Sequence, residues 1–410
     1  MRKAPHTDAG LVALAVALRG LGAEAVVCAP PDEEFTALLE RAGVELVPVG
    51  PTVRSVTAGA KPPTAADAVK LASDLVAEGF GTLTAAAEGC DVLLANGMTA
   101  AAGAQGAAER WGIPYVYACY HVRGLPPRKI APKASGQPAQ DAADKAHWEQ
   151  GQKAIAMFAD ALGNHRAGAG LPPVEDFLDY VYTDRPWLAA DPVLCPAPPE
   201  RTDIDVVQTG AWILPDHRPL PERLEAFLEA GTQPVYVGFG SMATASPADT
   251  ARVAIEAGRA LGRRVVLSRG WADLASIDDA EDCFVVGDVN QQALFPRVAA
   301  IVHHGGAGTT TASRSGTPQV VVPQIGDQPS WATSVAELGI GVAHQGPTAT
   351  TESLTTALST ALNPQTRARA GAVADTMRTD GATVAARLLL DAATTQRPPA
   401  TPHDPRTRPQ

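Results

Sequence analysis

The sequence is poor in aromatic residues and in basic charge, and both deficits exclude classes of protein. Only 5% of its 410 residues are aromatic, so alanine, valine and leucine have to fill its cores. The formal net charge is -11, which argues against nucleic acid or an anionic membrane as the main partner, because both bind a basic face. A phosphate-bearing ligand must then be held by local groups such as backbone N–H donors.

Cysteine and long apolar runs are also scarce. The five cysteines are Cys28, Cys90, Cys119, Cys195 and Cys283. They are odd in number, far apart and without a C-x-x-C pair, so neither a zinc site nor a disulfide framework is predicted, and we expect a reducing cytoplasm. Residues 1–10 lack the apolar segment of a signal peptide. No run approaches the roughly 20 apolar residues of a membrane span, so no stable membrane insertion is expected.

What is present is an alternation of short apolar runs with helical patterns, repeated in two halves. In the first half, strands are expected at 24–29, 44–49, 91–95 and 114–118. In the second half, they are expected at 234–239, 264–268, 283–286, 299–303 and 319–322. Such alternation predicts parallel sheets covered on both faces. Because the chain is too long for one core, we predict an α/β fold with two Rossmann-like domains.

The pattern also places helices and boundaries. Helices are expected at 11–20, 32–42 with Asp32 as its cap, 64–87 with Thr64 as its cap, and 143–167. Residues 121–142 are predicted to form a loop or lid, and the proline-rich residues 191–221 the interdomain connection. We place the N-terminal domain at 1–207 and the C-terminal domain at 208–395. Residues 396–410 are predicted to be a disordered tail.

The strongest chemical signal is the string IVHHGGAGTT at residues 301–310. A buried strand runs into a glycine-rich turn that opens a helix, where glycines let the backbone approach a ligand and free N–H groups suit a diphosphate. The hydroxyl of Thr310 could also donate. The candidate phosphate-binding residues are His303, His304, Gly305, Gly306, Ala307, Gly308 and Thr309. The alternative is a tight turn with no ligand.

Three other strand ends carry candidate ligand residues. The string PQIGDQ at 323–328 offers Gln324, Asp327 and Gln328 to a hydroxyl-rich ligand. The string GFGSM at 238–242 offers Ser241 to a phosphate, and Trp271 could flank a base. Open α/β sheets bind ligands at the carboxyl ends of their strands. For each of these features there is an alternative without a ligand. The residues 323–328 could form an ordinary polar loop, the residues 238–242 an ordinary turn, and Trp271 could simply be packed in the protein.

Together these motifs resemble the donor-binding half of GT-B glycosyltransferases of family 1. The likeness rests on HHGGAGT at 303–309, PQIGDQP at 323–329 and AELGIGVA at 336–343. The first half is similar to actinobacterial enzymes that decorate vancomycin-type glycopeptides. The strings concerned are CAPPD at 28–32, GLPPVED at 170–176, YTDRPW at 182–187 and QTGAWIL at 208–214. The resemblance spans residues 11–393.

The resemblance implies an inverting transferase with two sheets facing across a cleft. His303 and the turn at 305–309 would hold the diphosphate, assisted by Ser241. Asp327 and Gln328 would face the sugar hydroxyls. The partners implied are a nucleotide-sugar donor and a small-molecule aglycone, with no nucleic acid. We expect a monomer without a metal or other cofactor.

The resemblance also implies a base site and a donor. Val289, Gln291 and Trp271 would lie near the base. Gln324 stands where several deoxysugar-transferring relatives have arginine, which favours UDP-glucose over a dTDP-deoxysugar. The acceptor would be selected by the first half, and a glycopeptide-antibiotic aglycone is expected. The Asp203-Ile-Asp205 string has a spacing that some sugar transferases use for a metal, but its proline-rich surroundings favour a solvated acidic pair.

The N-terminus departs from the family pattern. Family members open with an apolar strand and a glycine-rich loop that carries an aspartate general base, and residues 1–10 replace both. A missing central strand would leave the backbone groups of its neighbours unpaired. Asp8 lies within one position of the expected base, and His6 is the second candidate.

The sequence is therefore compatible with two functions from different classes. The first is an active glycosyltransferase. The second is a nucleotide-sugar-binding pseudoenzyme or auxiliary protein without the catalytic base loop. A nucleotide-sugar epimerase is a third hypothesis, which the region around His303 disfavours.

Overall fold

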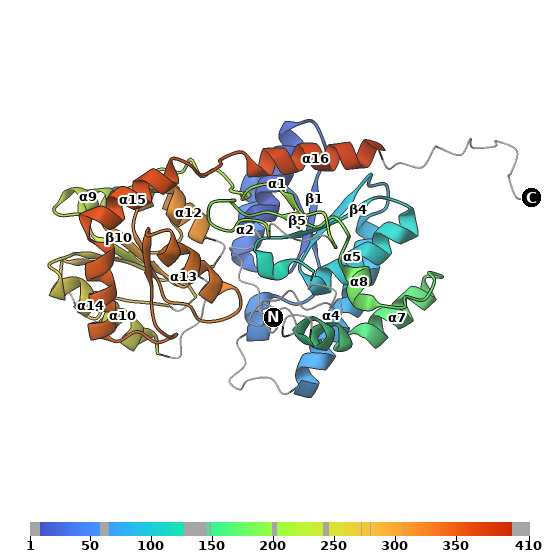
Figure 1. The fold of residues 1–410 in the computed structure, drawn as a ribbon, viewed down its shortest axis with the longest axis horizontal. Coiled ribbons are helices and arrows are strands. Elements are labelled where there is room, and N and C mark those ends of the chain that lie inside the picture. Colours follow the sequence, from blue (N-terminus) through green and yellow to red (C-terminus); the bar gives the residue numbers. More distant parts are fainter. Residues whose placement is uncertain are drawn as a thin grey trace, which may run out of the picture.

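The computed structural model describes residues 9–57, 65–126, 146, 149–198, 203–240, 246–271, 273–278, 280–306 and 308–395. These residues form two lobes that lie side by side (Figure 1). Each lobe contains parallel strands with helices packed around them. The α/β class predicted from the alternating pattern is therefore confirmed. Asp8, His6, Thr64, Ser241, Ala307 and the tail at 396–410 lie outside the described residues.

The N-terminal lobe holds its strands in two separate sheets. Strand β1 (Val26–Ala29) pairs in parallel with β2 (Glu45–Pro48). The second sheet has the order β3-β4-β5-β6. Its strands are β3 (Leu93–Asn96), β4 (Tyr115–Cys119), β5 (Trp187–Leu188) and β6 (Val207–Gln208). Within the described ranges, no strand lies between β1 and β3.

Helices surround these two sheets, and the first of them packs against both. The helices are α1 (Ala9–Gly20), α2 (Glu33–Ala42), α3 (Val53–Thr57), α4 (Ala65–Ala86), α5 (Met98–Trp111), α7 (Ala159–Gly168) and α8 (Phe177–Val181). Ala13 and Leu14 of α1 share a buried cluster with β4. Val12 and Ala15, on the other side of the same helix, share one with β1. Helix α1 therefore spans the separation between the two sheets.

The C-terminal lobe has one six-stranded parallel sheet in the order β12-β11-β10-β7-β8-β9. Its strands are β7 (Val235–Val237), β8 (Val265–Ser268), β9 (Cys283–Val286), β10 (Ala300–His303), β11 (Gln319–Val321) and β12 (Gly341–Ala343). Every residue of β7, β8, β10 and β11 is buried. The order reverses between β7 and β10, and such a switch point is where open α/β sheets bind ligands.

The helices of this lobe begin at recognisable sequence signals. They are α9 (Glu222–Glu229), α10 (Pro247–Ala260), α11 (Gln291–Leu294), α12 (Thr309–Arg314), α13 (Gln328–Glu337), α14 (Thr351–Ala361) and α15 (Pro364–Ala374). Proline occupies the start of α10 and α15, where its missing N–H costs nothing. Thr350 and Ser353 form a capping box at α14.

The position of the last helix, α16 (Gly381–Thr395), does not follow the predicted division into domains. It follows the C-terminal lobe in sequence but packs on α1, as Figure 1 shows. Ala385 and Leu389 of α16 share a buried cluster with Leu14 and Trp212. The apolar periodicity of a helix predicts that it is covered, but not which lobe covers it.

Three further local predictions differ from the structure. The helix predicted at 143–167 is interrupted by a turn at Met157 and Phe158, before α7. Strand β6 lies inside the predicted connection at 191–221, and β5 was not predicted, because two-residue strands are too short for periodicity to detect. Asp32 does not cap α2 with its side chain. Its carboxylate instead accepts from the N–H groups of Val53 (2.7 Å) and Arg54 (3.0 Å).

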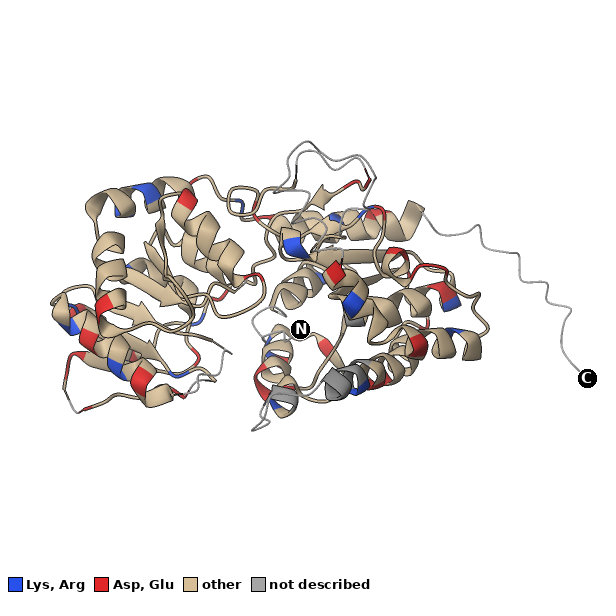
Figure 2. Cartoon of the chain, turned by 60° about the horizontal axis from the view of Figure 1, so that its bottom comes forward, with Lys and Arg blue, Asp and Glu red and all other residues tan. Residues whose placement is uncertain are grey.

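The exterior carries charges of both signs. Figure 2 shows acidic and basic residues interspersed along helices of both lobes. Among the helices in the described part of the chain, none is long and apolar enough to cross a bilayer.

Candidate active site

A cavity of about 3370 Å³ lies between the lobes and continues into the N-terminal lobe. In the C-terminal lobe its lining includes residues that follow β7, β8, β10 and β11. The predicted donor-site residues that line it are Trp271, Val289, Gln291, His303, His304, Gly306, Gly308, Thr309, Asp327 and Gln328. The fold thus brings residues from nearly 60 positions of sequence together on the C-terminal wall of the cavity, at the switch point of the sheet.

The turn after β10 needs glycine for steric reasons. Gly305 has φ of 83°, and a Cβ atom there would lie 2.6 Å from Val321 Cγ1. A Cβ at Gly306 would lie 2.5 Å from His304 Nε2. The backbone of the turn therefore approaches both β11 and the His304 ring more closely than a side chain would allow.

Replacing Gly305 by alanine is expected to lower the free energy of unfolding by about 1–3 kcal/mol, because a side chain at this φ is strained. The clash with Val321 should also move the turn and weaken UDP binding, which calorimetric titration measures. Gly346→Ala is the matched control, since Gly346 has φ of 79° but nothing within 4 Å of a new Cβ. Equal UDP affinity in G305A and the parent would contradict a role of this turn in binding.

His303 is buried and bonded within its own lobe. Its Nδ1 accepts from the Gly305 N–H (3.1 Å), and its Nε2 lies 2.8 Å from Gln319 Oε1. An accepting Nδ1 places the proton of the neutral ring on Nε2, which donates to Gln319. Burial lowers the pKa of His303 to about 4, against a smaller opposing effect of Gln319. Nδ1 thus holds the turn and Nε2 is bonded to Gln319 on β11, so both ring nitrogens of His303 are already engaged within the lobe.

Thr309 also serves the turn. Its hydroxyl donates to the Gly306 carbonyl at 2.6 Å, and the residue is fully buried. The expected role of this hydroxyl as a phosphate donor is therefore not supported by the geometry. Helix α12, which starts here, has only six residues. Gly306 and Gly308 of the turn line the cavity, where their backbone N–H groups could bind an anion.

The two glutamines of the PQIGDQ string hold a loop. Gln328 Oε1 accepts from the N–H groups of Gln324 (2.7 Å) and Ile325 (3.1 Å). The Gln324 amide donates to the carbonyls of Val322 (3.2 Å) and Pro347 (2.7 Å), and Gln324 does not line the cavity. The Gln324 side chain is thus directed to Pro347 and away from the cavity, and a contact of Gln324 with the donor stays a prediction.

Asp327 remains as the carboxylate of this loop that lines the cavity. Its Oδ2 accepts from Trp331 Nε1 at 3.1 Å. Trp331 is buried, and its ring centroid lies 4.8 Å from that of His121, a residue of the N-terminal lobe that also lines the cavity. Arg123 Nε donates to Ser330 Oγ at 2.8 Å. The sugar-binding candidate therefore lies beside a contact between the lobes.

His121 is a cavity residue that the sequence motifs did not indicate. It follows β4, is 5% exposed, and its Nδ1 accepts from the Arg123 N–H (3.1 Å). Its pKa falls to about 4, chiefly through burial, with Arg123 lowering it and Asp327 raising it. The ring is thus neutral at pH 7, with its proton on Nε2 as a donor.

The two buried histidines make stability depend on pH. Because the folded pKa of His121 and of His303 is about 4 and the unfolded value is about 6.5, the unfolded chain binds more protons between these values. Stability is full above pH 6.5 and falls as the pH drops toward 4, by about 2 kcal/mol per histidine at pH 5. Urea unfolding at pH 7.5 and pH 5.0 measures this loss. In H303Q, the difference between the two pH values should shrink by about 2 kcal/mol, and an unchanged difference would refute the assignment.

Trp271 also joins the lobes. Its Nε1 donates to Glu34 Oε1 at 3.1 Å, and the Arg54 guanidinium lies 5.0 Å from the ring centroid. Glu34 and Arg54 form an ion pair with each other. Arg54 covers one face of the Trp271 ring. A nucleobase could stack on that face only if Arg54 first moved away. Sequence reasoning found the tryptophan, but nothing local marks Glu34 or Arg54.

The loop after β9 is held by Asn290. Its side-chain oxygen accepts from the Ala293 N–H (3.0 Å), and its amide donates to the carbonyls of Asp216 (2.9 Å) and Arg218 (2.7 Å). The neighbouring Gln291 donates to the Tyr236 hydroxyl at 3.3 Å. The segment predicted to contact a base is therefore anchored to the connection between the lobes.

The Asp203-Ile-Asp205 string does not take part in the site. Asp205 forms an exposed ion pair with Arg185 (3.0 Å), and neither aspartate lines the cavity. The interpretation as a solvated pair agrees with this exposure. Across the described residues, no group of three or more His, Cys, Asp or Glu side chains is placed to hold a metal ion.

Two lobes with parallel sheets on either side of a cleft define the GT-B class of fold, and solved structures agree. The glycotransferase of kitacinnamycin has a TM-score of 0.72 and 25% identity, covering 93% of this chain and 95% of that chain. CalG4, the calicheamicin glycosyltransferase, has a TM-score of 0.65 and 16% identity, covering 93% of this chain and 92% of its own. At that identity the second likeness supports the fold alone.

Sequence comparisons give the family. Residues 264–388 match the erythromycin biosynthesis protein CIII-like C-terminal domain, and residues 9–176 match the glycosyl transferase 4-like domain. The vancomycin aglycone glucosyltransferase of Amycolatopsis orientalis is 54% identical over 393 residues, 95% of each chain. The dTDP-epi-vancosaminyltransferase of the same organism is 52% identical over 399 residues, again 95% of each. This chain belongs to the same family and is a glycosyltransferase.

Proposed function

We propose that the protein transfers glucose from UDP-glucose to a hydroxyl group of a glycopeptide-antibiotic aglycone. The observation that carries this proposal is the 54% identity to a vancomycin aglycone glucosyltransferase over 95% of both chains. A vancosaminyltransferase is almost equally similar, and Gln324, which favoured UDP-glucose, does not line the cavity.

In the proposed reaction, a general base removes the proton of the acceptor hydroxyl. The oxygen attacks the anomeric carbon, the bond to the diphosphate breaks on the opposite face, and the configuration inverts. Asp8 or His6 would supply the base. The N–H groups of the turn at Gly306 and Gly308, which line the cavity, would stabilise the charge that develops on the diphosphate, so that no metal ion is needed. Asp327 would orient the sugar.

The test is a transfer assay with purified protein, a vancomycin-type aglycone, and UDP-glucose, dTDP-glucose or dTDP-vancosamine in parallel. We expect a glucosylated product with UDP-glucose and at least tenfold slower turnover with the dTDP sugars. Faster turnover with a dTDP sugar would overturn the donor assignment.

Unfolding of the protein in the presence of UDP, dTDP or UDP-glucose measures donor binding independently, since a ligand at 100 times its Kd adds about 2.7 kcal/mol to the free energy of unfolding. Stabilisation by UDP-glucose without turnover on any aglycone would instead support the pseudoenzyme hypothesis.

A further inference from the structure

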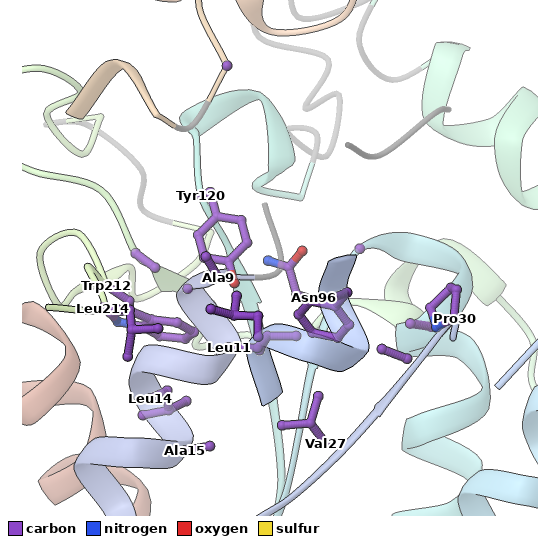
Figure 3. A pocket seen from close by; sticks show the side chains of 18 of the residues that line it. Ala9, Leu11, Leu14, Ala15, Val27, Pro30, Asn96, Tyr120, Trp212 and Leu214 are labelled. Carbon is purple, nitrogen blue, oxygen red and sulfur yellow. The ribbon is translucent and has the colours of Figure 1, made fainter. Parts of the chain in front are cut away.

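The end of β4 directs His121 toward the C-terminal lobe. Figure 3 shows the preceding residue, Tyr120, with its ring beside Ala9 at the start of α1. The Tyr120 ring also lies against that of Trp212, with centroids 5.8 Å apart. Successive side chains of an extended chain point to opposite sides, and His121 has an extended backbone. Its ring accordingly contacts the C-terminal lobe rather than α1.

One indole ring of the C-terminal lobe connects His121 with Asp327. The Trp331 centroid lies 4.8 Å from that of His121, and Trp331 Nε1 donates to Asp327 Oδ2 at 3.1 Å. Trp331 is buried, so its ring is a fixed support for both neighbours. His121 and Asp327 both line the cavity, and Asp327 is close enough to oppose the fall in the pKa of His121. The two side chains therefore meet at one part of the cavity, one from each lobe.

His121 and Asp327 offer opposite kinds of hydrogen-bonding group. The Nδ1 atom of His121 accepts from the Arg123 N–H at 3.1 Å, so the neutral ring carries its proton on Nε2. Among the described residues no group accepts from Nε2, and this atom is not fully enclosed. The Asp327 carboxylate is an acceptor only. The cavity therefore has one donor and one acceptor beside the same indole.

A hydroxyl group is the sugar substituent that satisfies both side chains. Its oxygen can accept from His121 Nε2–H while its proton is donated to Asp327. An ammonium group has donors only, so it could bond with Asp327 but would set an N–H against that of His121. A position without a substituent would leave both side chains unpaired. Because an unpaired polar group lowers the binding free energy, this pair can discriminate between sugars.

We propose that His121 is a specificity-determining residue for the donor sugar, and that together with Asp327 it selects a hydroxyl group and rejects an ammonium group at one position of the hexose. The inference rests on the proposed function in one respect, the orientation of the sugar by Asp327. It goes further by naming the sugars that are excluded, which are those with an amine at that position. It also assigns part of the donor selectivity to the N-terminal lobe, which the sequence linked only to the acceptor.

The test compares the parent with His121→Phe, which keeps a ring against Trp331 but removes the donor. The ligands are UDP-glucose and its analogues with an amino group in place of the hydroxyl at C2, C3, C4 or C6, at about pH 6.5, where a primary amine is protonated. Calorimetric titration gives each Kd. We expect the parent to bind one analogue about tenfold more weakly than UDP-glucose, and H121F to reduce this ratio to about twofold.

A second variant separates hydrogen bonding from packing. The amide of His121→Gln can donate to a hydroxyl or accept from an ammonium group. H121Q should therefore bind UDP-glucose within about threefold of the parent and also lose the discrimination. Arg123→Met is the matched control, because it removes the other contact between these segments, from Arg123 Nε to Ser330 Oγ (2.8 Å), and leaves the His121 ring in place. Its ratio of Kd values should equal that of the parent.

Two results would overturn the proposal. The first is a parent that binds every amino analogue as tightly as UDP-glucose. The second is an unchanged ratio in both H121F and H121Q, which would mean that His121 only packs on Trp331. The proposed function has a separate readout, which is the sugar that the parent transfers fastest in the assay with the aglycone. Transfer of glucose together with an unchanged ratio in the variants would overturn this inference alone.

Discussion

Replacing Asp327 by alanine is expected to lower kcat/KM for sugar transfer by about 10²- to 10⁴-fold. The carboxylate lines the cavity and accepts one bond from Trp331 Nε1, which leaves acceptor positions for two sugar hydroxyls. Each hydrogen bond to a charged group contributes about 1.5–3 kcal/mol, and about 1.4 kcal/mol corresponds to a tenfold change in rate. Steady-state assays with UDP-glucose and the aglycone measure the loss.

The control for this variant is Asp249→Ala, an exposed aspartate on α10 that is paired with Arg252 and lies outside the cavity. It should transfer at the parent rate. Asp327→Asn adds a second comparison, because it keeps an oxygen for Trp331 but removes the charge, and it should lie between alanine and the parent. If D327A transfers sugar as fast as the parent, the assignment of this loop to the donor is wrong.

Replacing Asp8 by asparagine is expected to lower kcat by about 10²- to 10⁴-fold, the usual contribution of a general base. The basis is the place of Asp8 in the sequence, one position from the aspartate base that the family pattern implies. Affinity for UDP should not change, because the base acts on the acceptor. The matched variant is His6→Asn, which should retain activity if Asp8 is the base.

The pair of variants separates the two candidates. A large loss in H6N with activity retained in D8N would transfer the role to His6, and the acid limb of the pH–rate profile would then move toward the pKa of an imidazole. Retained activity in both variants would exclude both residues. The general base would then have to be sought among the titratable groups that line the cavity, such as His121.

Four strands of the C-terminal sheet, β7, β8, β10 and β11, could be predicted from the sequence because they are buried on both faces, whereas β12 was not predicted. Burial of that kind requires consecutive apolar residues, as in β8 (VVLS) and β10 (AIVH), and such runs are visible without a structure. The same reasoning failed for β5 and β6, which are paired through two residues each. Their pairing depends on neighbours far away in the chain.

The glycine-rich turn could be predicted because its motif requires a particular backbone conformation. The contacts between the two lobes could not be predicted from the sequence. Gly305 must be glycine because of its φ and its contact with Val321, so the motif itself reveals the turn. Glu34 bonds with a residue 237 positions away, and Arg123 with one 207 positions away. Each is an ordinary charged residue in its local sequence. Gln324 and Gln328 were correctly placed in one loop, but the direction of their amides follows from the folding of that loop.

The return of α16 to the N-terminal lobe limits how the two lobes can move. The described chain passes between the lobes twice, after β6 and again before α16, and the two crossings touch. A Cβ at Gly381 would lie 2.4 Å from the Ala211 carbonyl oxygen, and Gly210 adopts φ of 89° beside it. The second crossing is also held by Asp191, whose carboxylate accepts a hydrogen bond from the Arg378 N–H at 2.8 Å. Because the two crossings are joined at one place, we expect any opening of the cleft to pivot about Gly210 and Gly381.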